Sequence, residues 1–168
     1  MNTDKSEDSL RGPVPDRLDR LDRRILQALQ ENGRISNQEL AAAVHLSPAQ
    51  SNRRHRRLES LGYIKRYEAR LDADRLGLGV TAFVHVTMER GQFKEVLKFQ
   101  RTIERMPEIL ECHAVTGDFD YVCKVVASDL KSLSNFLLGT LAQLPGVNGV
   151  RSSICLNELK CTSALPLE

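Results

Sequence analysis

The chain contains no tryptophan and only three tyrosines among its 168 residues. Sequence-specific RNA-binding modules stack bases on exposed aromatic side chains, so this composition argues against that class. No apolar run approaches the ~18 residues that a membrane-spanning helix needs. The N-terminus, MNTDKSEDSLRGPVPD, lacks the apolar stretch of a secretory signal. We therefore expect a cytoplasmic protein without membrane contact, whose residues 1–15 form a disordered leader.

The sequence patterns of common catalytic sites are also missing. There is no H-x-x-H or H-E-x-x-H motif, no glycine-rich phosphate loop and no evident pair of nucleophile and base. The four histidines share no spacing: His45, His55, His85 and His113. We expect a protein that is not an enzyme and that needs no cofactor.

The cysteines do not have the spacing of a metal site. They are Cys112, Cys123, Cys155 and Cys161, separated by 11, 32 and 6 positions, so no C-x-x-C pair exists. We expect small buried hydrophobic residues in a reducing compartment. A metal- or redox-responsive regulator remains an alternative, because Cys112 lies beside His113 and neighbouring strands would bring His85 near His113.

Positive charge is concentrated in the N-terminal part. Residues 16–71 hold twelve Lys/Arg against seven Asp/Glu, a local charge of +5. Residues 72–168 hold ten against twelve, a local charge of −2. A basic part joined to a mildly acidic one suggests that the first binds an anionic partner.

Residues 16–71 have the signals of three helices. Hydrophobic residues at helical spacing predict the first helix over about Asp19–Gln30. Ser36 and Glu39 form a capping box that starts the second helix. Ser47 followed by proline starts the third, which we expect over Pro48–Leu61. The tight connection between the last two helices is that of a helix-turn-helix, and YIKRYEARLD then predicts a short β-hairpin or wing.

Beyond a linker over 72–79 the hydrophobic period changes to that of strands. Successive segments predict a strand at 80–88, a helix from Phe93, two strands joined by a Gly-Asp turn, a helix after Asp129 and a last strand from Val147. This βαββαβ order predicts a ferredoxin-like sandwich over 80–160 with both helices on one sheet face, followed by a tail over 161–168. The fold class is α+β. The predicted strands carry apolar residues on both faces, although the helices would cover only one. The uncovered apolar face predicts self-association into a symmetric dimer.

The third helix has two distinct sides on a helical wheel. Ser51, His55 and Leu58 fall on the inner side, where we expect His55 to be partly buried and hydrogen-bonded. The outer side carries Ala49, Arg53, Arg56 and Arg57, with Gln50 and Arg54 on a flank. The same helix offers only Glu59 as an acidic partner, so DNA contact is favoured over a merely solvated basic face.

The start of a recognition helix reaches deepest into the major groove of double-stranded DNA. We assign base readout to Ala49, Gln50, Asn52 and Arg53. Arg54, Arg56 and Arg57 would hold the phosphate backbone. The remaining predicted DNA contacts are Ser47, Pro48, Lys65 and Arg66.

Several segments together resemble the Lrp/AsnC family of transcriptional regulators. They are LDRLDRRILQALQENGRIS, ELAAAVHLSPAQSNRRHRRLESLGYIKRYEARLD, RLGLG and TGDFDYVCKV, in the family's order and spacing. The resemblance covers Leu18 to about Leu159. It implies a DNA-binding regulator whose oligomerisation or DNA affinity responds to an amino acid, built from dimers that often form octamers. An effector-independent DNA-binding or architectural protein is the alternative.

The resemblance also implies where the effector binds. In the family it lies near the Gly-Asp turn, between sandwich domains of neighbouring subunits. The matching positions here are Gly117, Asp118, Asp120 and Tyr121, with Ala114 and Thr116 on the strand that leads to the turn. Such a turn can offer backbone amides to a carboxylate and Asp118 to an ammonium group. An ordinary hairpin turn is the competing interpretation.

The chain departs from the family at Ser51 and His55, which are usually apolar there. Both positions face the expected core of the helical domain.

Overall fold

The computed structural model describes residues 18–89, 91 and 93–167. The leader expected over 1–15 lies outside the described residues. The described chain forms two compact units: an N-terminal unit of residues 18–70 together with 161–167, and a C-terminal unit of residues 71–160. No described helix has the length and apolar character required to cross a membrane.

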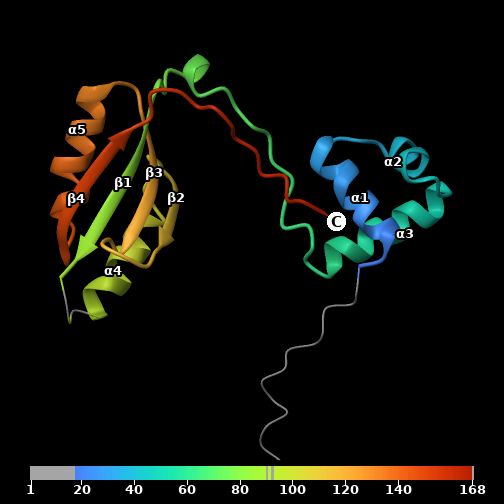
Figure 1. The fold of residues 1–168 in the computed structure, drawn as a ribbon, viewed down its shortest axis with the longest axis horizontal. Helices are drawn as coiled ribbons and strands as arrows, with labels where there is room; N and C mark the ends of the chain where they lie inside the picture. The colour runs from blue at the N-terminus through green and yellow to red at the C-terminus, as the bar shows by residue number, and fades with distance from the viewer. Residues whose placement is uncertain (1–17, 90, 92, 168) are drawn as a thin grey trace, which may run out of the picture. The chain divides into compact units, whose positions relative to one another are not determined.

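Three helices form the N-terminal unit: α1 (Arg20–Glu31), α2 (Asn37–Val44) and α3 (Pro48–Ser60) (Figure 1). Asp19, Ser36 and Ser47 cap them, and all three caps are complete capping boxes. His45 has the left-handed conformation, φ 57°, that lets the chain turn sharply between α2 and α3. The predicted helix-turn-helix is confirmed.

Apolar residues from all three helices fill the centre of this unit. Leu40, Val44 and Leu58 of α2 and α3 pack against α1 and are at most 1% exposed. The α1 residues in the same core are Ile25, Leu26 and Leu29. Burying a side chain of this size contributes about 1.5–3 kcal/mol, so the core holds α3 at a defined angle.

The segment after α3 differs from the expectation. Residues 64–72 are all described and contain no strand, so the predicted wing does not take the form of a β-hairpin. The segment packs back on α3 instead, where the Tyr67 hydroxyl donates to Glu59 (3.1 Å) and hydrogen-bonds to His55. Burial, and then the hydrogen bond to Glu59, raise the pKa of Tyr67 to about 12. His55 is 23% exposed, which agrees with a partly buried, hydrogen-bonded histidine.

The C-terminal tail belongs to the N-terminal unit. The Gln30 side chain and the Leu165 backbone form two hydrogen bonds of 2.6 and 3.1 Å, and Leu167 packs against the core. The Arg70 guanidinium donates to the Cys161 carbonyl (2.9 Å). The tail therefore belongs to the helical unit, a placement that we did not predict from the sequence.

Ser51 is fully buried on α3, and its Oγ has no hydrogen-bond partner among the described residues. A buried polar group without a partner destabilises the folded state. Ser51→Ala is therefore expected to raise the free energy of unfolding by about 1 kcal/mol. Urea unfolding followed by circular dichroism measures the change, and Ser60→Ala on the exposed end of α3 is the control. A loss of stability in Ser51→Ala would show that the hydroxyl has a partner.

The C-terminal unit has the predicted βαββαβ order (Figure 1). Its elements are β1 (Val80–Met88), α4 (Phe93–Ile103), β2 (Ile109–Ala114), β3 (Tyr121–Ala127), α5 (Leu130–Gly139) and β4 (Val147–Ile154). The strands form one antiparallel sheet in the order β2-β3-β1-β4. The ferredoxin-like class is confirmed, and a 3₁₀ turn (Asp74–Leu76) lies in the expected linker.

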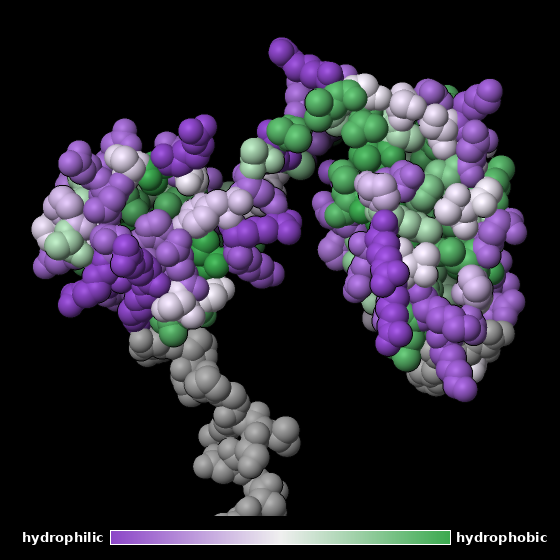
Figure 2. Space-filling model, turned by 180° about the vertical axis from the view of Figure 1, so that it is seen from behind, coloured by the Kyte–Doolittle hydropathy of each residue, from purple (hydrophilic) through white to green (hydrophobic). Residues whose placement is uncertain are grey.

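One sheet face packs against both helices. Alternate residues of β1, including Val84 and Val86, lie in one cluster with Phe99 of α4 and Leu133 of α5. The opposite face lacks a covering layer in the described chain. Phe83 (42% exposed) lies there, and Figure 2 shows apolar and hydrophilic side chains interspersed over the surface of this unit. This open face is the surface on which the expectation of self-association rests.

Candidate functional sites

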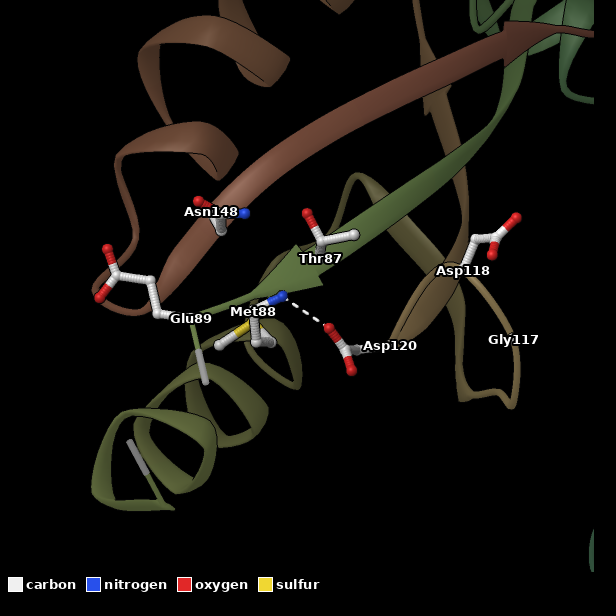
Figure 3. A pocket seen from close by; sticks show the side chains of 7 residues that line it. All are labelled: Thr87, Met88, Glu89, Gly117, Asp118, Asp120 and Asn148. Atoms are coloured by element: carbon white, nitrogen blue, oxygen red, sulfur yellow. Dashed lines mark hydrogen bonds between the residues drawn. The ribbon is translucent and has the colours of Figure 1, made fainter. Parts of the chain in front are cut away.

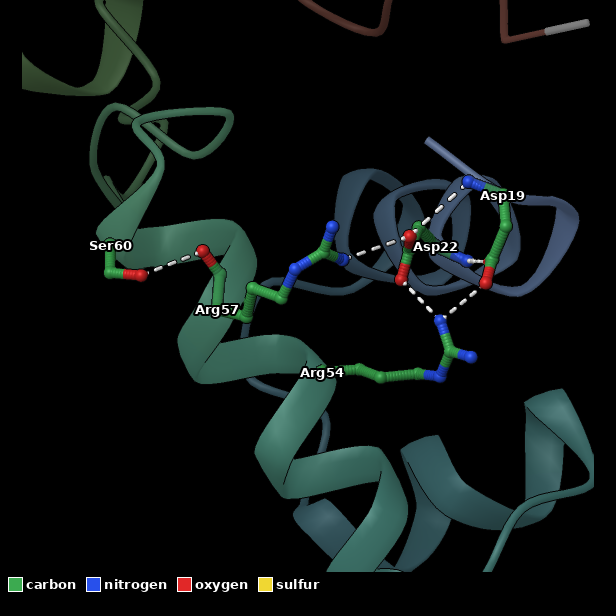
Figure 4. A network of polar contacts seen from close by, with 5 residues as sticks. All are labelled: Asp19, Asp22, Arg54, Arg57 and Ser60. Atoms are coloured by element: carbon green, nitrogen blue, oxygen red, sulfur yellow. Dashed lines mark hydrogen bonds and ion pairs between the residues drawn. The ribbon is translucent and has the colours of Figure 1, made fainter. Parts of the chain in front are cut away.

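The arginines of α3 divide into two pairs with different surroundings. Arg53 and Arg56 are exposed and make no ion pair with the described residues. Arg54 and Arg57 reach α1 instead, where both contact Asp22 (Figure 4). The spacing explains the division, because positions three apart on a helix share a face.

The inner pair surrounds a buried carboxylate. Asp22 is 1% exposed and lies 2.8 Å from Arg54 Nη1 and 3.2 Å from Arg57 Nη1. Arg54 Nη1 also lies 2.7 Å from Asp19. The pKa of the Asp19 carboxyl is lowered, chiefly because the Asp22 amide donates to it and then because Arg54 does. We call these four residues the α1–α3 ion cluster; it joins the first helix to the third.

This geometry corrects the expectation for two arginines. Their acidic partners come from α1 rather than from α3 itself, which offers only Glu59. Arg57 lies 36% exposed against Asp22 rather than on the outer side, and Arg54 is turned to the same helix. The freely available cations of α3 are Arg53 and Arg56.

The start of α3 is rigidly capped. Gln50 N donates to Ser47 Oγ (3.3 Å), and Ser47 N donates to Gln50 Oε1 (3.4 Å). The Asn37 side chain donates to the Pro48 carbonyl (3.1 Å) and ties α2 to this end. The cap occupies the side-chain oxygen of Gln50, a residue that we expected to read a base. Ala49 is exposed, and so are Lys65 and Arg66, although Arg66 also pairs with Glu68 (2.6 Å).

The Gly-Asp turn lies at the other candidate site. Residues 115–120 join β2 to β3, and Gly117 has φ 116°, a conformation that favours glycine. Asp120 anchors the turn to β1: its amide donates to the Val86 carbonyl (3.0 Å), and its carboxylate accepts from Met88 N (2.7 Å). Asp118 has no such anchor and makes no ion pair with the described residues.

A cavity of about 470 Å³ opens beside this turn (Figure 3). Gly117, Asp118 and Asp120 of the predicted effector residues line it. The other lining residues come from the end of β1 and the start of β4: Thr87, Met88, Glu89 and Asn148. We did not predict these four, because the pairing of β1 with β4 shifts register between Thr87 and Met88.

A second hollow of about 400 Å³ shares Thr87 and Asp118 with the first. His85, Phe119 and Arg151 contribute its side chains. The Arg151 guanidinium lies 5.5 Å from the Phe119 ring centre, within the range of a cation–π contact. Asp118 lines both spaces, so a ligand in either would meet its carboxylate.

Three predicted effector residues lie outside both cavities. Tyr121 points into the core, where its ring packs on Phe99 (4.9 Å between centroids) and its hydroxyl accepts from Gln100 (3.1 Å). Ala114 and Thr116 are exposed but line neither space. The prediction for Tyr121 as a lining side chain is not supported by this geometry.

The expected approach of two histidines is also wrong. His85 and His113 are both register partners of Val122, so β3 separates them. Three strands span roughly 10 Å at the usual spacing, too far for one metal ion to bind both rings. No cluster of three or more potential metal ligands occurs among the described residues.

Comparison with known proteins decides the family. A model described as the Lrp/AsnC ligand binding domain matches residues 81–165, and a winged helix-turn-helix DNA-binding model matches residues 18–65. The chain belongs to the Lrp/AsnC family. It is 41% identical over 161 residues to the leucine-responsive regulatory protein of Escherichia coli K12, covering 96% of this chain and 98% of that protein.

Solved structures of Lrp/AsnC regulators agree. A transcriptional regulator of Neisseria meningitidis in complex with L-Met is 39% identical, with a TM-score of 0.87 over 90% of this chain and 97% of that one. An AsnC family regulator of Agrobacterium tumefaciens is 32% identical, with a TM-score of 0.84 over 89% and 97%. The predicted family, fold class and role as a DNA-binding regulator with a ligand-binding domain are confirmed.

Proposed function

We propose that this Lrp/AsnC protein binds specific double-stranded DNA through α3 and changes its assembly or DNA affinity when it binds a free amino acid. The observation that carries the effector part is the position of Asp118 between two cavities beside the Gly-Asp turn. The similar Neisseria regulator solved with L-Met supports the same class of ligand.

The DNA surface consists of the exposed residues at the start and outer side of α3. Ala49, Asn52 and Arg53 read base edges, together with the free side-chain amide of Gln50. The outer arginine Arg56 contacts phosphates, and Ser47, Pro48, Lys65 and Arg66 extend that contact. Arg54 and Arg57 position the helix through the α1–α3 ion cluster. The chromosome of a bacterial or archaeal cell is in the cytoplasm, which is where we place the protein.

Opposite charges around Asp118 match the two ends of an amino acid. The Asp118 carboxylate suits an ammonium group, and the Arg151 guanidinium in the same hollow suits a carboxylate. The larger cavity adds Glu89 and Asp120, which make it still more attractive to a cation. A zwitterion whose ammonium and carboxylate groups are bonded to the same carbon therefore fits this region better than a simple anion does.

Self-association follows from the open sheet face. Phe83 is 42% exposed there. A second copy of the chain would bury it in a symmetric homodimer, from which larger assemblies up to an octamer can form. A charged substitution such as Phe83→Asp provides a size-exclusion test of this surface.

Asp118→Asn is expected to weaken amino-acid binding by about 10- to 100-fold. The substitution keeps the side-chain volume but removes the charge that the ammonium group contacts, a hydrogen bond to a charged group being worth about 1.5–3 kcal/mol. A thermal-shift screen over the twenty amino acids identifies the ligand, and titration calorimetry then compares wild type with variant.

Glu104→Ala is the matched control, because this acid is exposed at the end of α4 and lines neither cavity. It should bind the same amino acid as tightly as wild type. Equal affinity in Asp118→Asn would remove Asp118 from the site, and the absence of any hit would overturn the effector part of the proposal.

A further inference from the structure

Two cysteines face each other across the β2–β3 hairpin. Cys112 and Cys123 are direct register partners on these antiparallel strands, and their Sγ atoms lie 3.3 Å apart. Cys123 is 1% exposed within the core, whereas Cys112 is partly exposed at the edge strand. Both are free thiols in this structure.

The backbone already has the spacing of a disulfide. Directly opposed residues of an antiparallel pair have Cα atoms about 4.5 or 5.5 Å apart. Both values fall within the range of about 4.4–6.8 Å seen in disulfides. A bond of about 2.05 Å therefore requires side-chain rotation and no rearrangement of the strands.

The two thiols differ in a way that suits sequential oxidation. The hydrogen bond from Cys123 and the nearby His113 lower the pKa of Cys112 to about 7, while the same hydrogen bond and burial raise the pKa of Cys123. The more exposed thiol is thus also the one with more thiolate near neutral pH. Thiolate character and access together determine which cysteine an oxidant attacks first.

We propose that Cys112 and Cys123 form a reversible dithiol site that hydrogen peroxide converts into an intramolecular disulfide. The Cys112 thiolate attacks one peroxide oxygen; the O–O bond breaks, one water leaves after protonation, and Cys112 becomes a sulfenic acid. The Cys123 sulfur then attacks Cys112 Sγ; the S–O bond breaks and a second water leaves. The two thiols together lose two electrons and two protons, and one peroxide takes up both and is reduced to two waters.

The remaining cysteines lack this arrangement. Cys155 contacts the Asn157 carbonyl (3.8 Å), and Cys161 contacts the Arg70 guanidinium (2.7 Å). Neither has a sulfur among its hydrogen-bond partners in the described chain. The Cys155→Ser/Cys161→Ser variant therefore retains Cys112 and Cys123 as its two thiols. The residues around that pair are unchanged.

The disulfide would restrain the strands that carry the Gly-Asp turn. Cys123 follows Tyr121 by two positions on the same sheet face, and the turn over 115–120 links the two bonded strands. Oxidation would therefore alter amino-acid binding at Asp118. This consequence rests on the proposed function, whereas formation of the disulfide does not.

The test uses the full-length Cys155→Ser/Cys161→Ser protein treated with hydrogen peroxide. Intact mass should fall by the mass of two hydrogen atoms, free thiols should fall from two to none per chain, and dithiothreitol should reverse both changes. Peptide mapping should find Cys112 linked to Cys123 within one chain. The same linked peptide should appear in oxidised wild-type protein, which covers the case that the double variant folds poorly.

Two further variants show the order of events. With Cys123→Ser added, Cys112 has no resolving partner and should gain oxygen instead of losing hydrogen. With Cys112→Ser added, Cys123 should stay reduced because it is buried. Retention of both thiols in the parent variant, oxygen gain at Cys112 despite an intact Cys123, or a link between two chains would each overturn the proposal. None of these readouts depends on amino-acid binding.

Discussion

Arg54→Ala/Arg57→Ala is expected to lower the free energy of unfolding of the helical unit by about 3–5 kcal/mol, because it removes both arginine partners of a buried carboxylate. Asp22 is 1% exposed, and the two guanidinium groups are its cationic contacts from α3. A loss of this size is a large part of the stability of an ordinary domain.

Two matched variants separate the buried charge from a general loss of arginine. Arg53→Ala/Arg56→Ala removes the same two side chains from the outer face of the same helix, and should change stability by less than about 0.5 kcal/mol. Adding Asp22→Asn to Arg54→Ala/Arg57→Ala removes the uncompensated charge and should recover part of the loss.

Urea unfolding followed by circular dichroism measures these changes, and amide hydrogen exchange in α1 assigns them to the helical unit. Equal losses in the inner and outer double variants would contradict the division of the arginines. A further loss on adding Asp22→Asn would show that the carboxyl contributes through hydrogen bonds rather than through its charge.

Local signals in the sequence predicted most of the elements. Ser36 with Glu39, and Ser47 with Pro48, determine where α2 and α3 begin, because capping depends on residues within one turn. The change from helical to alternating hydrophobic spacing at Val80 likewise predicts the second unit. Such features need no knowledge of the rest of the chain.

Features that depend on distant residues were not predictable in the same way. Arg54 pairs with Asp22 across 32 positions, and Gln30 binds Leu165 across 135. The cavity beside the Gly-Asp turn needs Glu89 and Asn148, whose approach follows from a register shift between β1 and β4. A helical wheel shows which side of a helix a residue is on, but not which acid another helix presents to it.

The outer arginines are expected to affect DNA binding in two different ways. Arg56→Ala should reduce the slope of log K against log salt by about 0.9 for each phosphate contact that is lost, because fewer counterions are released on binding. Its effect should be similar on operator and scrambled DNA. Arg53→Ala should instead lower discrimination between the two by about 1–3 kcal/mol for each base contact that is lost.

Fluorescence anisotropy with an operator selected from random DNA, repeated over a series of salt concentrations, measures both quantities. Arg75→Ala is the control, since this exposed cation pairs with Asp72 in the linker and lies outside α3. It should leave slope and discrimination unchanged.

Arg53 and Arg56 are exposed, whereas Arg54 and Arg57 contact Asp22. Substitution of the outer pair therefore changes the DNA-facing side of α3 without removing the ion pairs that hold it to α1. A variant of the outer pair that loses DNA binding while unfolding normally assigns those side chains to the interface. If Arg53→Ala discriminates between operator and scrambled DNA as well as wild type does, then base readout belongs to Ala49, Gln50 and Asn52 rather than to Arg53. If the outer variants bind every DNA as wild type does at all salt concentrations, then α3 does not enter the groove by this face.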